Sequence, residues 1–461
     1  MIPMTLAEVA GVVGGRIVDG DPDIVVTAAA SDDRDCVPGT LFACIRGERA
    51  DGHDFIAGAR ERGAVASLVT RAVGSPAIVV DDVVLALGRL SSYVIQRLPG
   101  TLAFGITGSS GKTTTKDLLA AILAPHGETV APRGSFNSEV GLPLTVLSCS
   151  TRTRFLVLEM GMRGRDHIRY LCEIAHPRIA GVINVGSAHL ELLGSREAIA
   201  EAKGEIIEGL PADGTAILHA DNPLVMAQRD RTAARVVTFG ESPDADLRAT
   251  DVILDDHARP AFTLHWEGAS LPVRLTLSGE HQVANALAAT AFALAAGISL
   301  PDIVAAIEAY EPSSRWRMEV SERDDGVTVI NDAYNANPES MRAALKALAA
   351  IGQGRRTWAV LGEMREIGDT SVEEHDAIGR LAVRLDISRL IAVGEGSRPM
   401  HLGACHEGSW GDESAWVPDA AAAIELLKEE LRPGDVVLVK ASRSIGLEVV
   451  AAALLEPESA P

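Results

Sequence analysis

The chain has 461 residues, and 42 Lys and Arg against 63 Asp and Glu give it a net charge of −21 at pH 7. With 47% hydrophobic and 23% charged residues, the composition is globular and excludes disordered, collagen-like and disulfide-stabilised scaffolds. The acidic balance disfavours nucleic acid and anionic membranes as partners, and no apolar run reaches the roughly 20 residues that span a bilayer. The five cysteines form no Cys-x-x-Cys pair and no signal-peptide pattern is evident, so we expect a cytoplasmic protein.

The rhythm of apolar runs divides the chain into three sections. Up to about residue 97, short apolar runs alternate with turn residues, which is typical of a small α/β domain. Residues 98–312 follow a strand–loop–helix rhythm, and residues 313–461 repeat it with Ala-rich helices, as in a doubly wound sheet. The predicted fold class is therefore α/β with three domains: residues 1–97, a central P-loop ATPase-like parallel sheet over 98–312, and a Rossmann-like domain over 313–461.

Several apolar runs have the length of buried parallel strands and end at polar residues. Ligands of such sheets bind at the carboxyl ends of the strands, so the residues after each run are candidates for a site. The predicted strands are 64–69, 77–80, 102–106, 155–158, 179–183, 358–361, 390–393 and 436–439.

The strongest motif follows the predicted strand 102–106 and runs into a helix-like segment. Its glycines let successive backbone N–H groups surround a phosphate at a helix N-terminus. The Lys112 ammonium can reach the outer phosphates, and the Thr113 hydroxyl is placed to ligate Mg²⁺. We predict an ATP site that includes Thr107, Gly108, Ser109, Ser110, Gly111, Lys112, Thr113 and Thr114.

This loop departs from the general pattern, which has Gly at the position of Ile106. The alternative interpretation is an ordinary strand–turn–helix with a chance Gly-Lys-Thr. The loop alone does not distinguish kinases, ATPases and ligases, which all use it.

The loop form Thr-Gly-Ser-Ser-Gly-Lys-Thr-Thr resembles that of the Mur ligases, the ATP-dependent enzymes that build the stem peptide of peptidoglycan. Further segments carry the same resemblance, in order along nearly the whole chain. They are Pro38–Phe42, Asp51–Phe55, Gly134–Pro143, Leu158–Gly161, Asn184–Glu191, Ala202–Glu205, Gly279–Asn285, Asn331–Ser340, Leu361–Arg365 and Lys440–Arg443.

The resemblance implies an ATP-dependent amide ligase. Residues 331–338, Asn-Asp-Ala-Tyr-Asn-Ala-Asn-Pro, indicate the member that adds D-alanyl-D-alanine to UDP-MurNAc-tripeptide through an acyl phosphate, with release of ADP and phosphate. The first domain is then expected to hold UDP, the second ATP and the third the dipeptide. Whether the third residue of the tripeptide is meso-diaminopimelate or L-lysine stays open. We expect a monomer.

The resemblance also implies two Mg²⁺ ions, with Thr113, Glu159, His189 and a carbamylated Lys203 as ligands. Together with Lys112, the last three form the expected catalytic set. The alternatives are a solvated strand-end Glu159, a space-filling His189 and a surface Lys203. Carbamylation by CO₂ requires a neutral amine, so burial or a nearby cation must lower the pKa of Lys203.

For the nucleotide, the resemblance implies contacts from Asn137 near the γ-phosphate, Asn285 at adenine, Arg317 at phosphate and Asp332 at ribose. Asn137 has a competing interpretation as a turn residue. Trp316 stands where the family usually has Gly.

The resemblance implies further residues for the substrates. We expect Tyr334 and Asn335 to face substrate, whereas Asn337 either does so or caps the helix that begins at Pro338. Asp33 stands where the family has Ser, and a carboxylate there would be unfavourable beside a pyrophosphate. His375, Lys440, Ser442 and Arg443 are assigned to the dipeptide or the nucleotide, and Arg34, Arg46, Gly47 and His53 to the uridine nucleotide.

Three other functions stay open at this point. A ligase that adds the third residue would carry Asp-Asn-Pro-Arg in its last domain, a signature that is absent here, since Asp221–Leu224 lies in the central section and lacks the Arg. A relative acting on a non-peptidoglycan substrate is kept open by Asp33. An ATP-binding regulator would not need the second metal site.

Overall fold

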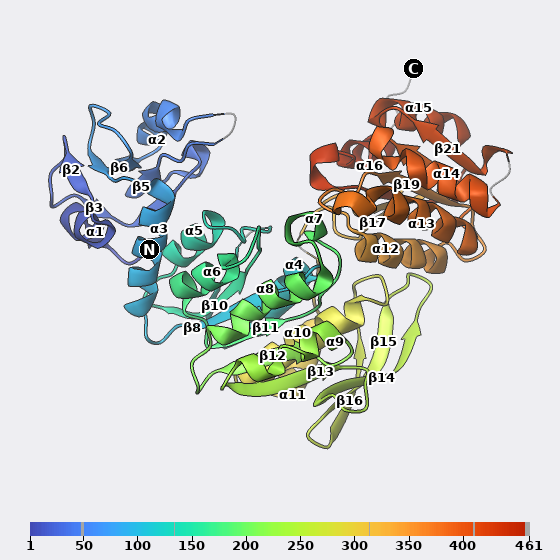
Figure 1. Cartoon of the computed structure of the whole chain (residues 1–461), viewed down its shortest axis with the longest axis horizontal. Helices are drawn as coiled ribbons and strands as arrows, with labels where there is room; N and C mark the ends of the chain where they lie inside the picture. Colours follow the sequence, from blue (N-terminus) through green and yellow to red (C-terminus); the bar gives the residue numbers. More distant parts are fainter. Residues whose placement is uncertain (48–49, 133, 313, 409–410, 457–461) are drawn as a thin grey trace.

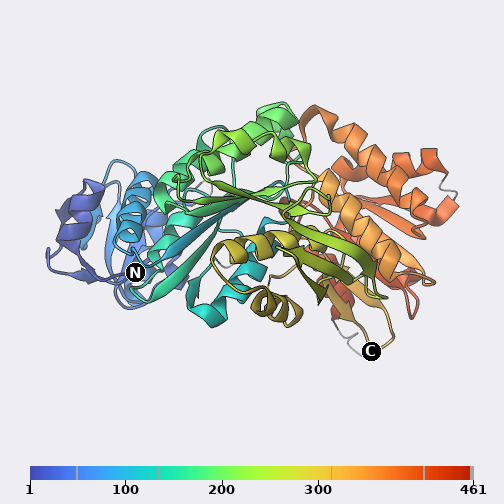
Figure 2. The ribbon, with the colours of Figure 1, turned by 90° about the horizontal axis from the view of Figure 1, so that it is seen from below.

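The computed structural model describes residues 1–47, 50–132, 134–312, 314–408 and 411–456. Three large β-sheets follow one another along the chain, each covered by helices (Figure 1). The N-terminal and C-terminal sheets lie at opposite ends of the molecule, with the central sheet between them, and the view from below shows the same order (Figure 2). Within the described ranges, no helix combines the length and apolar character needed to cross a membrane.

The N-terminal section is built on a five-stranded sheet of order β2-β7-β6-β5-β4, in which only β2 runs antiparallel to its neighbour. Helix α3 leads from it to the central sheet. The elements are β1 (Met4–Thr5), α1 (Leu6–Val13), β2 (Arg16–Val18), β3 (Val25–Val26), β4 (Ala28–Ala30), β5 (Thr40–Ala43), α2 (Ile56–Glu61), β6 (Ala64–Val69), β7 (Ala77–Val79) and α3 (Val83–Gln96).

The central sheet has nine strands in the order β16-β15-β14-β13-β12-β11-β8-β10-β9, parallel from β9 to β14. Its strands are β8 (Leu102–Thr107), β9 (Glu128–Val130), β10 (Thr153–Glu159), β11 (Ile179–Val182), β12 (Thr215–His219), β13 (Arg235–Gly240), β14 (Leu247–Leu254), β15 (Pro260–Trp266) and β16 (Ala269–Arg274). Its helices are α4 (Lys112–Leu123), α5 (Gly141–Leu147), α6 (His167–Ala175), α7 (Leu190–Leu193), α8 (Arg196–Glu208), α9 (Pro223–Met226), α10 (Gln282–Ala295) and α11 (Leu300–Glu308).

Both faces of the central sheet are buried, which explains the uninterrupted apolar strands. Along β8, Ala103 belongs to the cluster shared with α5, α6 and α8, whereas Phe104 belongs to the cluster of α4, α10 and α11. The prediction of parallel strands here is confirmed. The strand–loop–helix rhythm does not hold over 247–274, because β14, β15 and β16 form an antiparallel, partly exposed extension of the sheet.

The C-terminal sheet has the order β17-β18-β22-β19-β20-β21, and all pairs except β17–β18 are parallel. Its elements are β17 (Glu319–Glu322), β18 (Thr328–Asn331), α12 (Pro338–Ile351), β19 (Thr357–Gly362), α13 (Ser371–Arg384), β20 (Arg389–Val393), α14 (Arg398–Glu407), β21 (Ser414–Val417), α15 (Ala420–Glu430), β22 (Val436–Lys440) and α16 (Glu448–Leu455).

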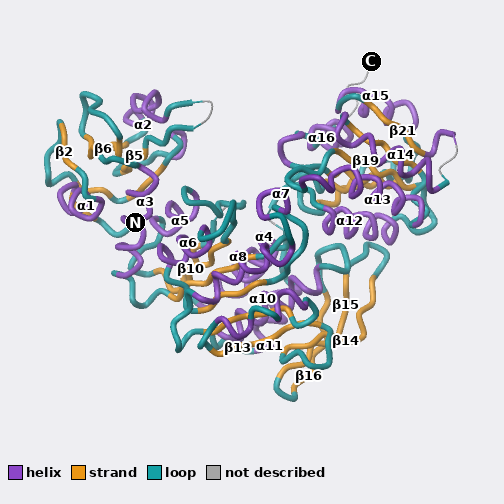
Figure 3. The backbone as a smooth tube through the Cα atoms, in the orientation of Figure 1, coloured by secondary structure: helices purple, strands orange, loops and turns teal. Residues whose placement is uncertain are grey.

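Successive residues of β22 point to opposite sides of this sheet. Leu438 packs in the cluster of α12, α13 and α14, and Val439 in that of α15 and α16. The predicted doubly wound sheet is confirmed, and Figure 3 shows its strands enclosed by helices. The domain limits at 97/98 and 312/313 stay a prediction, and Ser313 lies outside the described residues.

Helices α13 and α14 meet at two glycines. A Cβ atom on Gly379 would lie 1.8 Å from the Met400 carbonyl oxygen, and one on Gly403 would lie 2.3 Å from the Asp376 carbonyl oxygen. Because both obstacles are backbone atoms, the helices would have to move apart to admit a methyl group.

We expect Gly379→Ala to lower the free energy of unfolding by about 2 kcal/mol. The control is Gly11→Ala on α1, where no atom lies within 4 Å of the added Cβ; it should stabilise the chain by about 0.5 to 1 kcal/mol through helix propensity. Differential scanning calorimetry measures both. A neutral Gly379→Ala would contradict the close packing of α13 on α14.

Candidate functional site

A cavity of about 580 Å³ lies between the central and C-terminal sheets. The central section contributes the loop after β8, the segments after β9, β10 and β11, and the start of α10. The C-terminal section contributes the segment after β18 and the end of β22. The predicted site residues that line it are Ser109, Ser110, Gly111, Lys112, Thr113, Thr114, Asn137, Glu159, His189, Asn285, Arg317, Asp332, Tyr334, Asn335, Asn337 and Lys440.

The loop between β8 and α4 has the geometry that its glycines predict. Gly111 precedes α4 with φ +76°, and a Cβ there would lie 2.1 Å from Asn285 Oδ1, so both the backbone angle and the close approach require glycine. Gly108 accepts a hydrogen bond from Lys112 Nζ at 2.7 Å. Ile106 is fully buried within β8, so the departure from the general motif falls in the strand, one residue before Thr107 ends it.

Asn184, directly after β11, holds this loop from the other side. Its Oδ1 accepts the backbone N–H groups of Ser109 at 2.7 Å and Ser110 at 3.0 Å, and its Nδ2 donates to the Ser110 carbonyl at 2.9 Å. The sequence analysis gave Asn184 no role, although its position just after a predicted strand could have identified it as a candidate site residue.

Asn285 lines the cavity beside the phosphate loop. Its Nδ2 donates to Gln282 Oε1 at 2.8 Å and its side chain packs against Gly111. Its proposed role at adenine therefore stays a prediction, whereas its contact with the phosphate loop is observed.

Glu159 ends β10 and is buried at the floor of the cavity. Its Oε2 accepts the Thr113 hydroxyl at 2.7 Å, and its Oε1 accepts Asn137 Nδ2 at 2.7 Å. Two predicted residues, Thr113 and Asn137, thus converge on the Glu159 carboxylate. His189 precedes α7 with φ +67°, and its Nδ1 lies 2.9 Å from Glu366 Oε2 in a close ion-pair contact that is not an aligned hydrogen bond. The neighbouring imidazole lowers the pKa of Glu366.

Lys203 lies on the buried face of α8 and is 1% exposed. Burial, with the nearby Lys112 ammonium second, lowers the pKa of Lys203 well below its usual value. Burial also lowers the pKa of Lys112, against the opposing effect of Glu159. Across the part of the chain that the structure describes, no hydrogen bond or ion pair engages the Lys203 side chain. It does not line the cavity.

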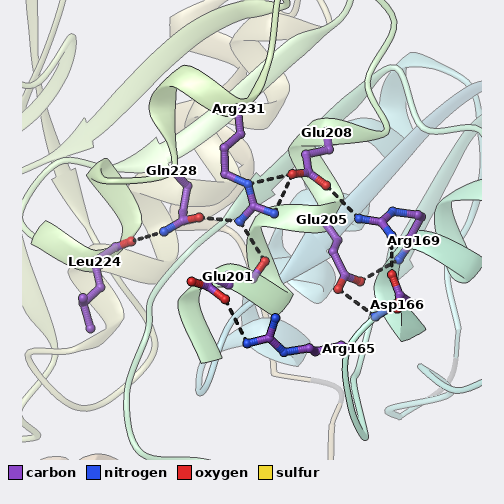
Figure 4. A network of polar contacts seen from close by, with 9 residues as sticks. All are labelled: Arg165, Asp166, Arg169, Glu201, Glu205, Glu208, Leu224, Gln228 and Arg231. Atoms are coloured by element: carbon purple, nitrogen blue, oxygen red, sulfur yellow. Dashed lines mark hydrogen bonds and ion pairs between the residues drawn. The ribbon is translucent and has the colours of Figure 1, made fainter. Parts of the chain in front are cut away.

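A polar network on the outer side of α8 fixes this helix (Figure 4). Glu205 accepts the backbone N–H groups of Asp166 at 2.7 Å and Arg169 at 3.1 Å, at the start of α6. Glu208 bonds to Arg169 at 3.1 Å and to Arg231 at 2.8 Å. The register of α8, and with it the position of Lys203, is therefore set by charges outside the cavity.

The cavity fits a nucleotide-bound magnesium ion better than a metal held by protein alone. Among the described residues, no three His, Cys, Asp or Glu side chains gather in a way that could hold a metal. Mg²⁺ usually takes one or two carboxylates and completes its shell with phosphate and water. Glu159 and Thr113, beside the phosphate loop, supply that minimum.

Residues that follow β18 in the C-terminal section line the same cavity. Asp332 accepts Lys440 Nζ and the Met318 N–H at 3.1 Å, and Lys440 Nζ also donates to the Asn335 carbonyl at 2.9 Å. The Arg317 guanidinium stacks on the Tyr334 ring, 4.1 Å from its centroid.

Two further placements answer questions that the sequence left open. Trp316 has φ +61°, the left-handed region that glycine adopts freely, which accounts for the Gly usually found there. Asn337 is the N-cap of α12, with its Oδ1 accepting the Ser340 N–H at 2.9 Å, so the capping prediction is confirmed. Its Nδ2 also donates to the Ser109 carbonyl at 3.3 Å, which joins the cap to the phosphate loop.

Three predicted substrate residues do not line the cavity. His375 is fully buried, with Nε2 accepting the Met364 N–H at 2.9 Å and Nδ1 donating to the Ser371 carbonyl at 2.6 Å, so this arrangement gives it a structural role. Ser442 accepts the Arg365 N–H at 2.9 Å, and Arg443 pairs with Glu448 at 2.7 Å.

The predicted uridine residues lie in the N-terminal section, apart from the cavity. His53 is held between Asp51 Oδ1, 2.5 Å from Nδ1, and the Thr70 N–H. Arg34 is exposed and pairs with Asp32, whose pKa it lowers to about 2. Arg46 and Gly47 are exposed in a turn.

The structure places in the cavity two residues to which the sequence analysis gave no role, His281 and Gln282. At the start of α10, Gln282 is buried and His281 is half-buried. Burial lowers the pKa of His281 to about 4, so the imidazole is neutral near pH 7.

Comparison with known proteins agrees with this arrangement. Residues 29–93 match the Mur ligase family catalytic domain, residues 106–293 the Mur ligase middle domain, and residues 316–443 the Mur ligase glutamate ligase domain. The chain is 48% identical to a UDP-N-acetylmuramoyl-tripeptide–D-alanyl-D-alanine ligase of Mycobacterium tuberculosis, over 100% of this chain and 99% of that protein. This chain belongs to the Mur ligase family.

Other family members extend the comparison. A Bacillus subtilis protein of the same name is 35% identical, over 99% of both chains. A crystal structure of MurF from Acinetobacter baumannii matches with a TM-score of 0.89 at 32% identity, over 99% of both chains. A MurF ligase from Thermotoga maritima in complex with ADP matches with a TM-score of 0.80 at 28% identity, over 93% of this chain and 97% of that one. The ADP complex of that relative supports the use of ATP by this Mur ligase.

The neutral imidazole of His281 makes stability depend on pH. Its pKa rises from about 4 in the folded chain to about 6.5 in the unfolded one, so the unfolded state binds more protons between these values and stability falls as the pH drops below 6.5. We expect wild type to lose about 1 kcal/mol more than His281→Gln between pH 7.5 and pH 5.5. Denaturant titrations at both values measure this difference. The exposed His406→Gln control should follow wild type, and a parallel response of all three proteins would contradict a neutral His281.

Proposed function

We propose that this Mur ligase joins D-alanyl-D-alanine to UDP-MurNAc-tripeptide at the expense of ATP, which yields UDP-MurNAc-pentapeptide, ADP and phosphate. The observation that carries the proposal is the 48% identity over the whole chain to a ligase of that name. The cavity supports it, because the phosphate loop and residues 331–338 face each other across it. We further propose that the enzyme works as a monomer in the cytoplasm.

The chemistry requires activation of a carboxylate, which is a poor electrophile. The terminal carboxylate of the tripeptide attacks the γ-phosphorus of ATP, ADP leaves, and an acyl phosphate forms. The dipeptide amine then adds to the acyl carbon, the nitrogen gives up a proton, and phosphate departs with the bonding electrons and takes up that proton. Lys112 and Arg317 are the cations that balance phosphate charge, so catalysis consists of positioning and charge stabilisation.

The proposed nucleotide contacts come from both sides of the cavity. Backbone N–H groups of the phosphate loop would bind the phosphates, with Asn137 beside the γ-phosphate and Asp332 near the ribose. Mg²⁺, when bound, neutralises phosphate charge, and Thr113, Glu159 and His189 are its proposed ligands. Tyr334, Asn335 and Lys440 would meet the acceptor or the dipeptide. The N-terminal residues Arg34, Arg46, Gly47 and His53 would bind the uridine nucleotide.

We also propose that Lys203 carries a carbamate. Its amine is buried and has a strongly lowered pKa beside Lys112, and a neutral amine adds CO₂ with loss of one proton. The product is an anion, which adds a second carboxylate-like group for Mg²⁺.

The first experiment measures phosphate release from Mg²⁺–ATP and D-alanyl-D-alanine with two nucleotides. UDP-MurNAc-tripeptide should give turnover and a product heavier by one dipeptide, as seen by mass spectrometry, whereas UDP-MurNAc-dipeptide should give none. Turnover with UDP-MurNAc-dipeptide and a free amino acid would instead indicate the ligase that adds the third residue. Binding of ATP without turnover on either nucleotide would indicate a different acceptor.

The carbamate predicts chemical rescue. Lys203→Ala should reduce turnover by about 10²- to 10³-fold, because it removes an anion at developing charge, and millimolar short-chain carboxylates should restore part of it. The control is Lys346→Ala, at an exposed position of α12, which should keep wild-type turnover with or without carboxylate. Full activity of Lys203→Ala would refute the carbamate, and an inactive variant that carboxylates do not rescue would argue for a purely structural lysine.

A further inference from the structure

The loop after β11 is held by residues that lie more than 140 positions later in the chain. Ser187 donates its backbone N–H to Glu339 Oε1 and its hydroxyl to Glu339 Oε2, both at 2.9 Å. His189 Nδ1 lies 2.9 Å from Glu366 Oε2. The C-terminal section therefore places two carboxylates on the segment that carries His189.

The backbone at this contact is constrained on both sides. His189 has φ +67° and Glu366 has φ +63°, an arrangement that costs non-glycine residues energy and persists where surroundings impose it. Gly368, with φ +63°, packs directly on the following turn, where an added Cβ would lie 3.1 Å from Glu191 Cα. Two strained segments thus meet through one imidazole–carboxylate contact.

The contact with Glu366 gives the two nitrogens of the His189 imidazole different surroundings. Nδ1 is buried against Glu366, whereas among the described residues nothing forms a hydrogen bond with Nε2. The ring lines the cavity, so Nε2 is the nitrogen that is free to meet a ligand there. A metal-bound histidine usually donates its other ring N–H to a carboxylate or carbonyl, which fixes the tautomer and the direction of the ring.

We propose that Glu366 is a positioning residue: it holds the Nδ1 side of His189 and so directs Nε2 to the magnesium–nucleotide site. This inference rests on the proposed metal role of His189. Since Glu366 and Glu339 belong to the C-terminal section and His189 to the central one, the metal site is complete only while the two sections are docked. Docking of the section that binds the dipeptide is thereby coupled to the site where the phosphoryl group moves.

The test uses the full chain with ADP and Mn²⁺, a paramagnetic replacement for Mg²⁺. Electron paramagnetic resonance gives the Mn²⁺ dissociation constant, and ¹⁵N spectra of histidine-labelled protein report the tautomer of the ring assigned by its loss in His189→Ala. We expect Glu366→Ala to weaken Mn²⁺ binding about 10- to 100-fold and to change the His189 tautomer signal. Glu366→Gln, whose side chain has the same size and can still place an oxygen beside Nδ1, should recover most of the affinity.

Two further variants distinguish the docking of the C-terminal section on the central one from a general effect of losing a nearby carboxylate. Asp369→Asn removes a carboxylate three residues away that is exposed, and it should leave Mn²⁺ affinity within about twofold. Gly368→Val keeps Glu366 but crowds the Glu191 backbone, and it should weaken Mn²⁺ binding in the same direction as Glu366→Ala. Thermal midpoints are measured in parallel, so that a loss caused by unfolding is recognised.

Each outcome bears on the proposal separately from the ligase activity, because no acceptor or dipeptide is present. Wild-type Mn²⁺ affinity and tautomer signal in Glu366→Ala would overturn the positioning role. Unchanged affinity in His189→Ala would overturn the metal assignment on which the proposal rests. Weakened affinity in Glu366→Ala, together with a wild-type enzyme that fails to ligate D-alanyl-D-alanine in the separate turnover assay, would keep the positioning role and reject the proposed function.

Discussion

The constraint on which the site depends is the crowding of basic side chains beside the phosphate loop. The Lys112 ammonium helps to lower the pKa of Lys203, Arg317 helps to lower the pKa of Lys112, and Glu159 is the carboxylate that opposes the shift at Lys112. Removing charges from water is expensive unless they are paired. The folded chain therefore holds a cavity whose electrostatics are completed by anions, and the phosphates of ATP are the anions for which the loop after β8 is shaped.

The geometry of that loop follows from sheet order. Strand β8 lies between β10 and β11, so the carboxyl ends of its two neighbours deliver Glu159 on one side and Asn184 on the other. Parallel strands make this convergence unavoidable. The C-terminal section then adds contacts to the same loop from outside: Asn337 reaches the Ser109 carbonyl, and Tyr334 bonds to Ser135. The site thus belongs to two sheets that no local sequence signal connects.

This division explains what could be predicted from the sequence. Strands, the phosphate loop and the capping Asn337 depend on residues close in the chain, and the structure confirms them. The roles of His281 and Glu339 depend on burial and on partners more than a hundred residues away, which periodicity does not report. His375 was assigned to the dipeptide or the nucleotide through the resemblance, and this stays a prediction; in the structure the side chain is buried and backbone groups bond to both of its nitrogens.

The N-terminal section carries the remaining departure from the family pattern, and its packing changes how Asp33 is interpreted. The Asp33 carboxylate pairs with Arg62 at 2.8 Å, and a Cβ on Gly58 would lie 2.8 Å from the same Oδ2 atom. The charge of Asp33 is thus balanced by Arg62 at the C-terminal end of α2. A carboxylate that is already paired adds little field at a neighbouring phosphate. On sequence grounds, Asp33 left open a relative with a different substrate. In the structure, Asp33 gives no electrostatic reason to exclude a uridine nucleotide. The assignment of the ligase function therefore depends on the cavity between the other two sheets.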